Sequence, residues 1–133
     1  MKYPDIPIGF SRAKTREVSE KLIKDFAELS EDRNPLHLDE EYAQKTIFGR
    51  RIAHGMLTAS FISALLAENF PGGVYLSQTL NWLRPVRIGD EITTSFLVTE
   101  KNDAKKILHL STEWKNQKNE ILLNGVAIIK LCE

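Results

Sequence analysis

The chain has 133 residues, of which 42% are hydrophobic and 27% charged, a composition typical of a soluble globular protein. Its 18 basic and 18 acidic residues cancel, so no global field favours binding to nucleic acid or an acidic membrane. The single cysteine, Cys132, excludes an internal disulfide and favours a reducing compartment, so we expect a cytoplasmic protein. The longest apolar stretch, residues 56–67, is too short to span a bilayer. We therefore expect a single domain over residues 1–133.

The first half of the chain predicts a strand followed by helices. Residues 8–16 form a plausible strand, and Ser19 can cap a helix that runs to residue 31. The helical spacing of Leu22, Ile23, Phe26 and Leu29 makes that helix amphipathic. Asn34-Pro35 ends it, because a residue before proline is pushed out of the helical region. A short helix over residues 40–46 and a loop over 47–54 follow.

The second half predicts one apolar helix and then strands. Residues 55–69 are apolar or small on every face, which predicts a helix buried on all sides. Pro71-Gly72-Gly73 ends this helix. The strands that follow are expected over residues 74–83, 92–100, 107–114 and 121–131. This order predicts an α+β fold in which a five-stranded antiparallel sheet wraps around the apolar helix. One such sheet cannot cover the helix and also protect its own edges, so we expect a homodimer.

A short polar motif lies where the first helix ends. Asp32, Asn34, Pro35 and His37 form the pattern Asp-x-Asn-Pro-x-His, and the small residue Ala43 follows. This pattern resembles the hydratase-2 motif of the MaoC-like family. That family often has glycine before the aspartate, where this chain has Glu31.

The resemblance extends over roughly residues 8–131. His54-Gly55-Met56 opens the apolar helix as in that family, and Arg84-Pro85-Val86-x-x-Gly89-Asp90 is similar to its strand-turn element. The chain looks like the small (R)-specific enoyl-CoA hydratases that supply polyhydroxyalkanoate synthesis. The resemblance implies a hot-dog fold with an overhang segment that carries the motif. It also implies reversible syn hydration of trans-2-enoyl-CoA to (R)-3-hydroxyacyl-CoA, with no cofactor beyond the coenzyme A of the substrate.

The residue chemistry agrees with that activity. Adding water to an enoyl thioester needs a base for the water, an acid for the α carbon and a donor for the developing enolate oxygen. Asp32 and His37 can divide the two proton transfers, because the proline turn lets His37 fold back toward the end of the first helix. The backbone N–H of Gly55, at the amino end of the apolar helix, is the candidate oxyanion donor.

Supporting roles are expected for further residues. The Asn34 amide can orient the loop or the water, and the resemblance implies that Ser63 hydrogen-bonds within the site near the carboxylate. The acyl-chain pocket is expected at Leu65, Leu66 and Ile129.

Other polar residues have simpler interpretations. His54 is expected to bond the backbone before the helix, and Ser60 to bond a carbonyl one turn back. No spacing of the histidines and carboxylates matches a metal site, so no metal is expected. Four arginines could meet the phosphates of coenzyme A, without one being preferred: Arg50, Arg51, Arg84 and Arg87.

Two other functions remain open on the same residues. A 3-hydroxyacyl-ACP dehydratase or an acyl-CoA thioesterase of this fold would usually carry a carboxylate on the buried helix, where this chain has none before Glu68. A non-catalytic acyl-thioester binding domain would need an apolar tunnel, but it would not need Asp32 and His37 together.

Overall fold

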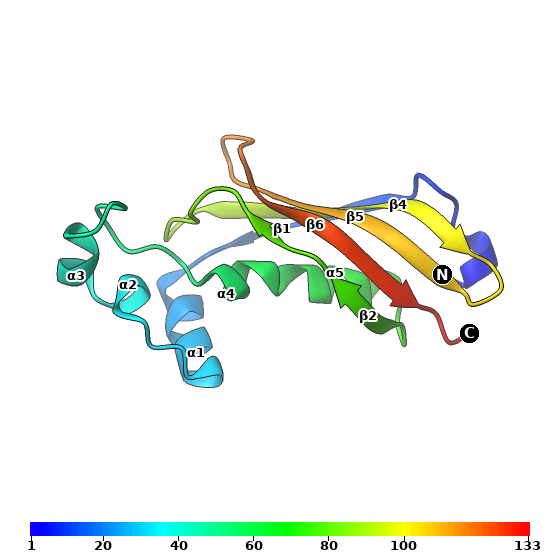
Figure 1. Cartoon of the computed structure of the whole chain (residues 1–133), viewed down its shortest axis with the longest axis horizontal. Helices are drawn as coiled ribbons and strands as arrows, with labels where there is room; N and C mark the ends of the chain where they lie inside the picture. The colour runs from blue at the N-terminus through cyan, green and yellow to red at the C-terminus, as the bar shows by residue number, and fades with distance from the viewer.

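The computed structural model describes residues 1–133, and its helices and strands follow the predicted order. None of the helices has the length and hydropathy that crossing a membrane would require. The elements shown in Figure 1 are a 3-10 helix η1 (Tyr3–Asp5), β1 (Ser11–Glu17), α1 (Glu20–Ser30), α2 (Pro35–Leu38), α3 (Glu40–Gln44), α4 (Gly55–Ala59), α5 (Phe61–Asn69), β2 (Val74–Gln78), β3 (Asn81–Trp82), β4 (Glu91–Asn102), β5 (Ile107–Lys115) and β6 (Ile121–Lys130).

All strands join one antiparallel sheet, in the order β1-β4-β5-β6-β2, with β3 also paired to β6. The long strands β4 and β5 alternate buried and exposed residues, as expected for a sheet with one covered face. The buried positions of β5 are Leu108, Leu110, Thr112 and Trp114. This face packs on α4 and α5, which run beneath the sheet in Figure 1, and Trp114 Nε1 donates a 2.9 Å hydrogen bond to the carbonyl of Thr58.

The central helix differs from the prediction in two ways. It is divided at Ser60, whose Oγ donates to the carbonyl of Leu57 at 2.6 Å, which confirms the predicted bond to the preceding turn. Burial on all sides was wrong for the single chain, because the sheet covers one side of the helix only. The uncovered side includes Ser63, Ala64 and Ala67, which are exposed.

The sheet has six strands, where the sequence predicted five. The segment predicted as one strand over 74–83 is broken between β2 and β3, after a register shift between Tyr75 and Ser77. The backbone of Thr79 crosses directly over Gly125 of β6, where a Cβ atom would lie only 1.8 Å from the Thr79 carbonyl oxygen. The bend between β2 and β3 therefore depends on Gly125 in the partner strand. Because this glycine lies outside residues 74–83, the pattern of that segment could not predict the bend.

The overhang segment lies beyond one end of the sheet and consists of α1, α2 and α3 (Figure 1). Ser19 caps α1 as predicted, because its Oγ accepts the N–H of Leu22 at 3.2 Å. Ile23 and Ala27 are the buried residues of α1. The overhang places the chain between α1 and α2, with its polar motif, near the amino end of α4.

Candidate active site

The polar motif folds as two consecutive side-chain turns. Helix α1 ends at Ser30, and Glu31 adopts a left-handed conformation with φ 63° and ψ 12°. The Asp32 carboxylate accepts the N–H of Asn34 at 3.2 Å, and Asn34 Oδ1 accepts the N–H of Leu36 at 3.0 Å. These bonds reverse the chain and cap α2 at its first turn, so that His37 returns toward Asp32.

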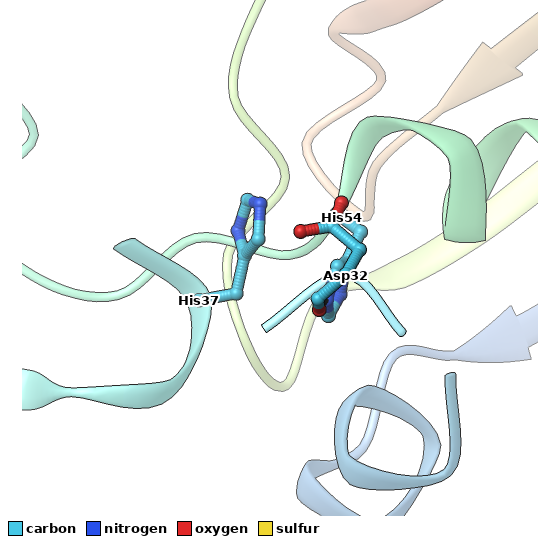
Figure 2. Close-up of side chains that lie close together, drawn as sticks. All are labelled: Asp32, His37 and His54. Carbon is cyan, nitrogen blue, oxygen red and sulfur yellow. Dashed lines mark hydrogen bonds between the residues drawn. The ribbon is translucent and has the colours of Figure 1, made fainter. Parts of the chain in front are cut away.

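The structure brings Asp32 and His37 together. Figure 2 shows the Asp32 carboxylate and the His37 ring facing each other, and a potential ligand atom of each lies within 4.8 Å of the other. Asp32 is exposed and His37 is buried. His37 Nδ1 lies 2.8 Å from the carbonyl oxygen of Ile52, which can only accept, so the neutral ring carries its proton on Nδ1. Nε2 is then free to take up a proton.

Burial sets the protonation state of this ring. Desolvation lowers the pKa of His37 below its ordinary value of 6.5, and electrostatic repulsion from the neighbouring His54 and Arg51 lowers it further. The carbonyl of Ile52 and the carboxylate of Asp32 act in the opposite direction, because both favour the cation. The net effect favours a neutral imidazole at neutral pH, as a proton acceptor requires.

His54 is the third member of this cluster. Only 1% of the residue is exposed, its Nε2 donates to the backbone carbonyl of Asp32 at 3.0 Å, and its ring centroid lies 4.1 Å from that of His37. The edge of Phe26 packs on its ring at a centroid distance of 5.0 Å. Its Nδ1 is buried without a hydrogen-bond partner. The predicted backbone bond is confirmed, but the sequence did not show that its acceptor is the carbonyl of Asp32 in the polar motif.

The reactive cavity opens beside His37 and the amino end of α4. It has a volume of about 300 Å³, and both His37 and Gly55 line it. Gly55 is the first residue of α4, so its N–H has no acceptor within the helix. The Trp82 indole packs against it, since a Cβ atom on Gly55 would lie 2.5 Å from Trp82 Nε1. A side chain at position 55 would therefore force the Trp82 indole to move.

The remaining predicted residues lie elsewhere. Ser63, Leu66 and Ile129 line a second hollow of about 170 Å³, on the uncovered side of α5. Leu65 is buried in the core and lines neither hollow. Within the single chain, Ser63 therefore does not line the cavity beside His37. The helical pattern placed Ser63, Leu65 and Leu66 on one helix but could not distinguish the face toward the core from the face toward the second hollow.

Three side chains of the site could together hold a metal ion. One potential ligand atom from each of Asp32, His37 and His54 lies within 4.8 Å of the others. One nitrogen of each ring is already committed to a backbone carbonyl, which leaves His37 Nε2, His54 Nδ1 and the carboxylate. The sequence-based expectation that no metal is bound stays a prediction.

An antiparallel sheet folded over a central helix, with a carboxylate and an imidazole near the amino end of that helix, defines a protein of the hot-dog fold. The family model described as a MaoC like domain matches residues 6–119. The chain therefore belongs to the MaoC-like family.

Named proteins that are similar to this chain support its membership in the family. An (R)-specific enoyl-CoA hydratase of Rhodospirillum rubrum is 46% identical over 112 residues, which are 83% of this chain and 78% of the relative. The solved (R)-hydratase from A. caviae, described as involved in PHA biosynthesis, superposes with a TM-score of 0.91 at 39% identity, over 96% of this chain and 98% of the other. A mitochondrial 3-hydroxyacyl-[acyl-carrier-protein] dehydratase of Arabidopsis thaliana is 38% identical over 92% of this chain and 75% of its own.

Proposed function

We propose that the protein is an (R)-specific enoyl-CoA hydratase, a hydro-lyase that adds water reversibly to trans-2-enoyl-CoA and forms (R)-3-hydroxyacyl-CoA. The observation that carries the proposal is that Asp32 lies beside His37, and that His37 lines one cavity together with Gly55. The (R) stereochemistry and the coenzyme A thioester follow from the similarity to the named hydratases.

The Asp32 and His37 side chains carry out the proton transfers in this proposal. One of the two groups takes a proton from a water molecule held between them, the resulting hydroxide adds to the β carbon, and the pair passes that proton on to the α carbon, so that the carboxylate and the neutral imidazole are restored.

Gly55 stabilises the enolate that forms in between. Its N–H points from the amino end of α4, where the helix dipole favours negative charge. One such donor contributes about 3 kcal/mol to transition-state stabilisation in comparable sites. No step of this reaction needs an electron carrier or a metal, so we propose that coenzyme A enters only as part of the substrate.

We further propose a cytoplasmic homodimer. Strand β2 is a free edge of the sheet, and its apolar residues Val74, Tyr75 and Leu76 are 46%, 39% and 50% exposed. The hollow with Ser63, Leu66 and Ile129 lies next to this edge, because Tyr75 also lines it. A second copy would cover the edge and close the hollow into an acyl-chain pocket. Light scattering after gel filtration measures the oligomeric state.

A role in polyhydroxyalkanoate synthesis is part of the same proposal and rests on the A. caviae hydratase.

The second candidate is a 3-hydroxyacyl-ACP dehydratase, which the Arabidopsis relative favours. It uses the same chemistry in the opposite direction and differs in the carrier of the acyl group. A thioesterase of this fold would carry a carboxylate on the central helix. The first acidic residue of α4 and α5 is Glu68, near the end of α5, so this function has no support. A scaffold without catalysis would not need Asp32 and His37 in one place.

The decisive experiment follows the loss of conjugated-enoyl absorbance of crotonyl-CoA. Asp32→Asn and His37→Ala should each lower kcat by a factor of about 10² to 10⁴. Asp25→Asn on the exposed face of α1 and His109→Ala in β5 are matched controls with ordinary activity. Circular dichroism checks that all variants are folded. Full activity of either site variant would refute the assignment, and an (R)-specific dehydrogenase coupled to the product tests the stereochemistry.

A further inference from the structure

A polar hollow of about 360 Å³ lies next to the reactive cavity and takes no part in the chemistry described above. Four basic side chains line it, Arg50, Arg84, Arg87 and Lys118, against two acidic ones, Asp90 and Glu120. The hollow therefore carries two net positive charges in a chain whose formal net charge is zero. A concave site with this charge is suited to an anion.

Both carboxylates of the hollow are already engaged by the protein. Asp90 is buried and accepts the backbone N–H of Arg87 at 2.9 Å and Gln117 Nε2 at 3.0 Å. Glu120 lies 3.1 Å from Arg84 and accepts the amide of Asn116 at 2.9 Å. The positive charge is consequently not cancelled by free carboxylates on the hollow's wall.

Two of the basic side chains have no anionic partner. Arg50 and Lys118 are exposed, and neither forms an ion pair or a side-chain hydrogen bond. The other arginines of this region have structural partners: Arg87 donates to the carbonyl of Phe48 at 3.0 Å, and Arg51 binds the carbonyl of His37 and the carboxylate of Glu20. Arg50 and Lys118 are therefore the groups available to a ligand.

The hollow adjoins the reactive cavity, because two residues form part of both walls. Arg84 and Pro85 line both, and Phe48, which lines the reactive cavity, is held by Arg87 of the polar hollow. A ligand whose acyl end lies at His37 can thus extend past Pro85 into the basic hollow. The reactive cavity is mainly apolar, and the neighbouring hollow is almost wholly polar.

We propose that this hollow binds the adenosine 3′,5′-bisphosphate end of coenzyme A, with Arg50 and Lys118 as the phosphate-binding residues. The proposal rests on the proposed function and adds how the carrier of the acyl group is recognised. An apolar cavity next to a basic hollow matches a thioester arm that ends in phosphates. The concave shape favours a small polyanion over the acidic surface of a carrier protein, because a stable protein interface needs about 800 Å² on each partner.

The test compares crotonyl-CoA with crotonyl-pantetheine, which has the same reactive end and no phosphate. In the double variant Arg50→Ala/Lys118→Ala, the preference for the CoA thioester, as a ratio of kcat/KM values, should fall about tenfold, as expected for the loss of two exposed charge contacts. Lys2→Ala/Lys105→Ala is the matched control: it removes two exposed lysines that do not line the hollow, one directly before η1 and one in the turn between β4 and β5. Calorimetry with adenosine 3′,5′-bisphosphate should show weaker binding to the first variant only, and weaker binding to the wild type at high salt.

The possible outcomes separate this proposal from the proposed function. An unchanged preference with unchanged binding of the bisphosphate overturns the assignment of the hollow, even if the enzyme hydrates both thioesters. A loss confined to a crotonyl-carrier protein substrate also overturns it, in favour of a protein docking surface. If neither thioester is hydrated, the proposed function fails, while the calorimetric comparison still decides whether the hollow binds the nucleotide.

Discussion

Replacing His54 by phenylalanine tests whether His54 positions Asp32 for catalysis or only stabilises the fold around it. The variant keeps a ring that can pack against Phe26 and stack on His37, but it removes the hydrogen bond to the carbonyl of Asp32. The carboxylate of Asp32 is exposed, so few other contacts fix its position. We expect His54→Phe to lower kcat about 100-fold, since displacement of a reacting group by about 1 Å has this effect.

The expected change in stability is small, because two effects oppose each other. The lost hydrogen bond of 3.0 Å costs about 1 kcal/mol, and the Asp32 carbonyl can turn to water. Nδ1 of His54, however, is buried without a partner, and removing such a group relieves a desolvation penalty of about 1–3 kcal/mol. The free energy of unfolding in urea should therefore remain within about 1 kcal/mol of the wild type or rise.

Glutamine is the control, because its Nε2 can take the place of the histidine Nε2 and donate to the same carbonyl. His54→Gln should recover most of the kcat that His54→Phe loses. Equal activity of the phenylalanine variant and the wild type would refute the idea that this hydrogen bond positions Asp32. A loss of the same size in both variants would refute it as well.

The pKa of His37 gives an independent measurement by NMR titration. His54→Phe removes an imidazole whose electrostatic interaction lowers this pKa, so the pKa should rise, whereas Asp32→Asn removes a carboxylate that raises it, so the pKa should fall. In the wild type the folded-state pKa lies below the unfolded value of 6.5. The neutral ring therefore contributes stability that is present above pH 6.5 and is lost as the pH falls through the folded-state pKa.

Two further substitutions test the backbone of the site. Gly55→Ala puts a Cβ atom 2.5 Å from Trp82 Nε1, so it should lower kcat by a factor of about 10 to 100 because the indole is displaced. Adding Trp82→Ala should restore part of the lost kcat, and a double-mutant cycle measures this rescue. Glu31→Gly should raise the free energy of unfolding by about 1 kcal/mol, because Glu31 has φ 63° and glycine adopts this region without strain. Asn119→Gly, also at φ 63°, should gain less in urea denaturation, since asparagine tolerates this conformation better.

The long elements could be predicted from the sequence because each carries its own periodicity. Ser19 and the apolar spacing that follows placed α1 to within one residue at each end, and the alternation of β4 and β5 gave their buried faces. The first strand begins at Ser11 and not at residue 8, because Phe10 is held in a turn by the carbonyl of Pro7 at 3.1 Å. Such errors arise where a contact outside the element decides its boundary.

Within the site, the sequence predicted only those features that depend on residues close together in the chain. Asp32 and Asn34 form turns with the N–H groups two residues on, and these bonds can be expected from their types and spacing. The role of His54 depends on a carbonyl 22 residues away, which no local pattern contains. A histidine directly before a helix that begins with glycine is the only sequence signal for it.

The orientation of His37 shows why the chemistry depends on distant parts of the chain. The carbonyl that fixes its tautomer belongs to Ile52, and Ile52 is placed by an isolated bridge to Arg87 and by the bond from the N–H of Ala53 to the carbonyl of Val86 at 2.8 Å. The Arg84–Asp90 strand-turn segment therefore aligns the base, although none of its side chains contacts the proton that moves. Since Arg87 and Asp90 also line the basic hollow, a ligand that binds there can influence the position of Ile52. The binding of the nucleotide end and the alignment of His37 thus share one structural element.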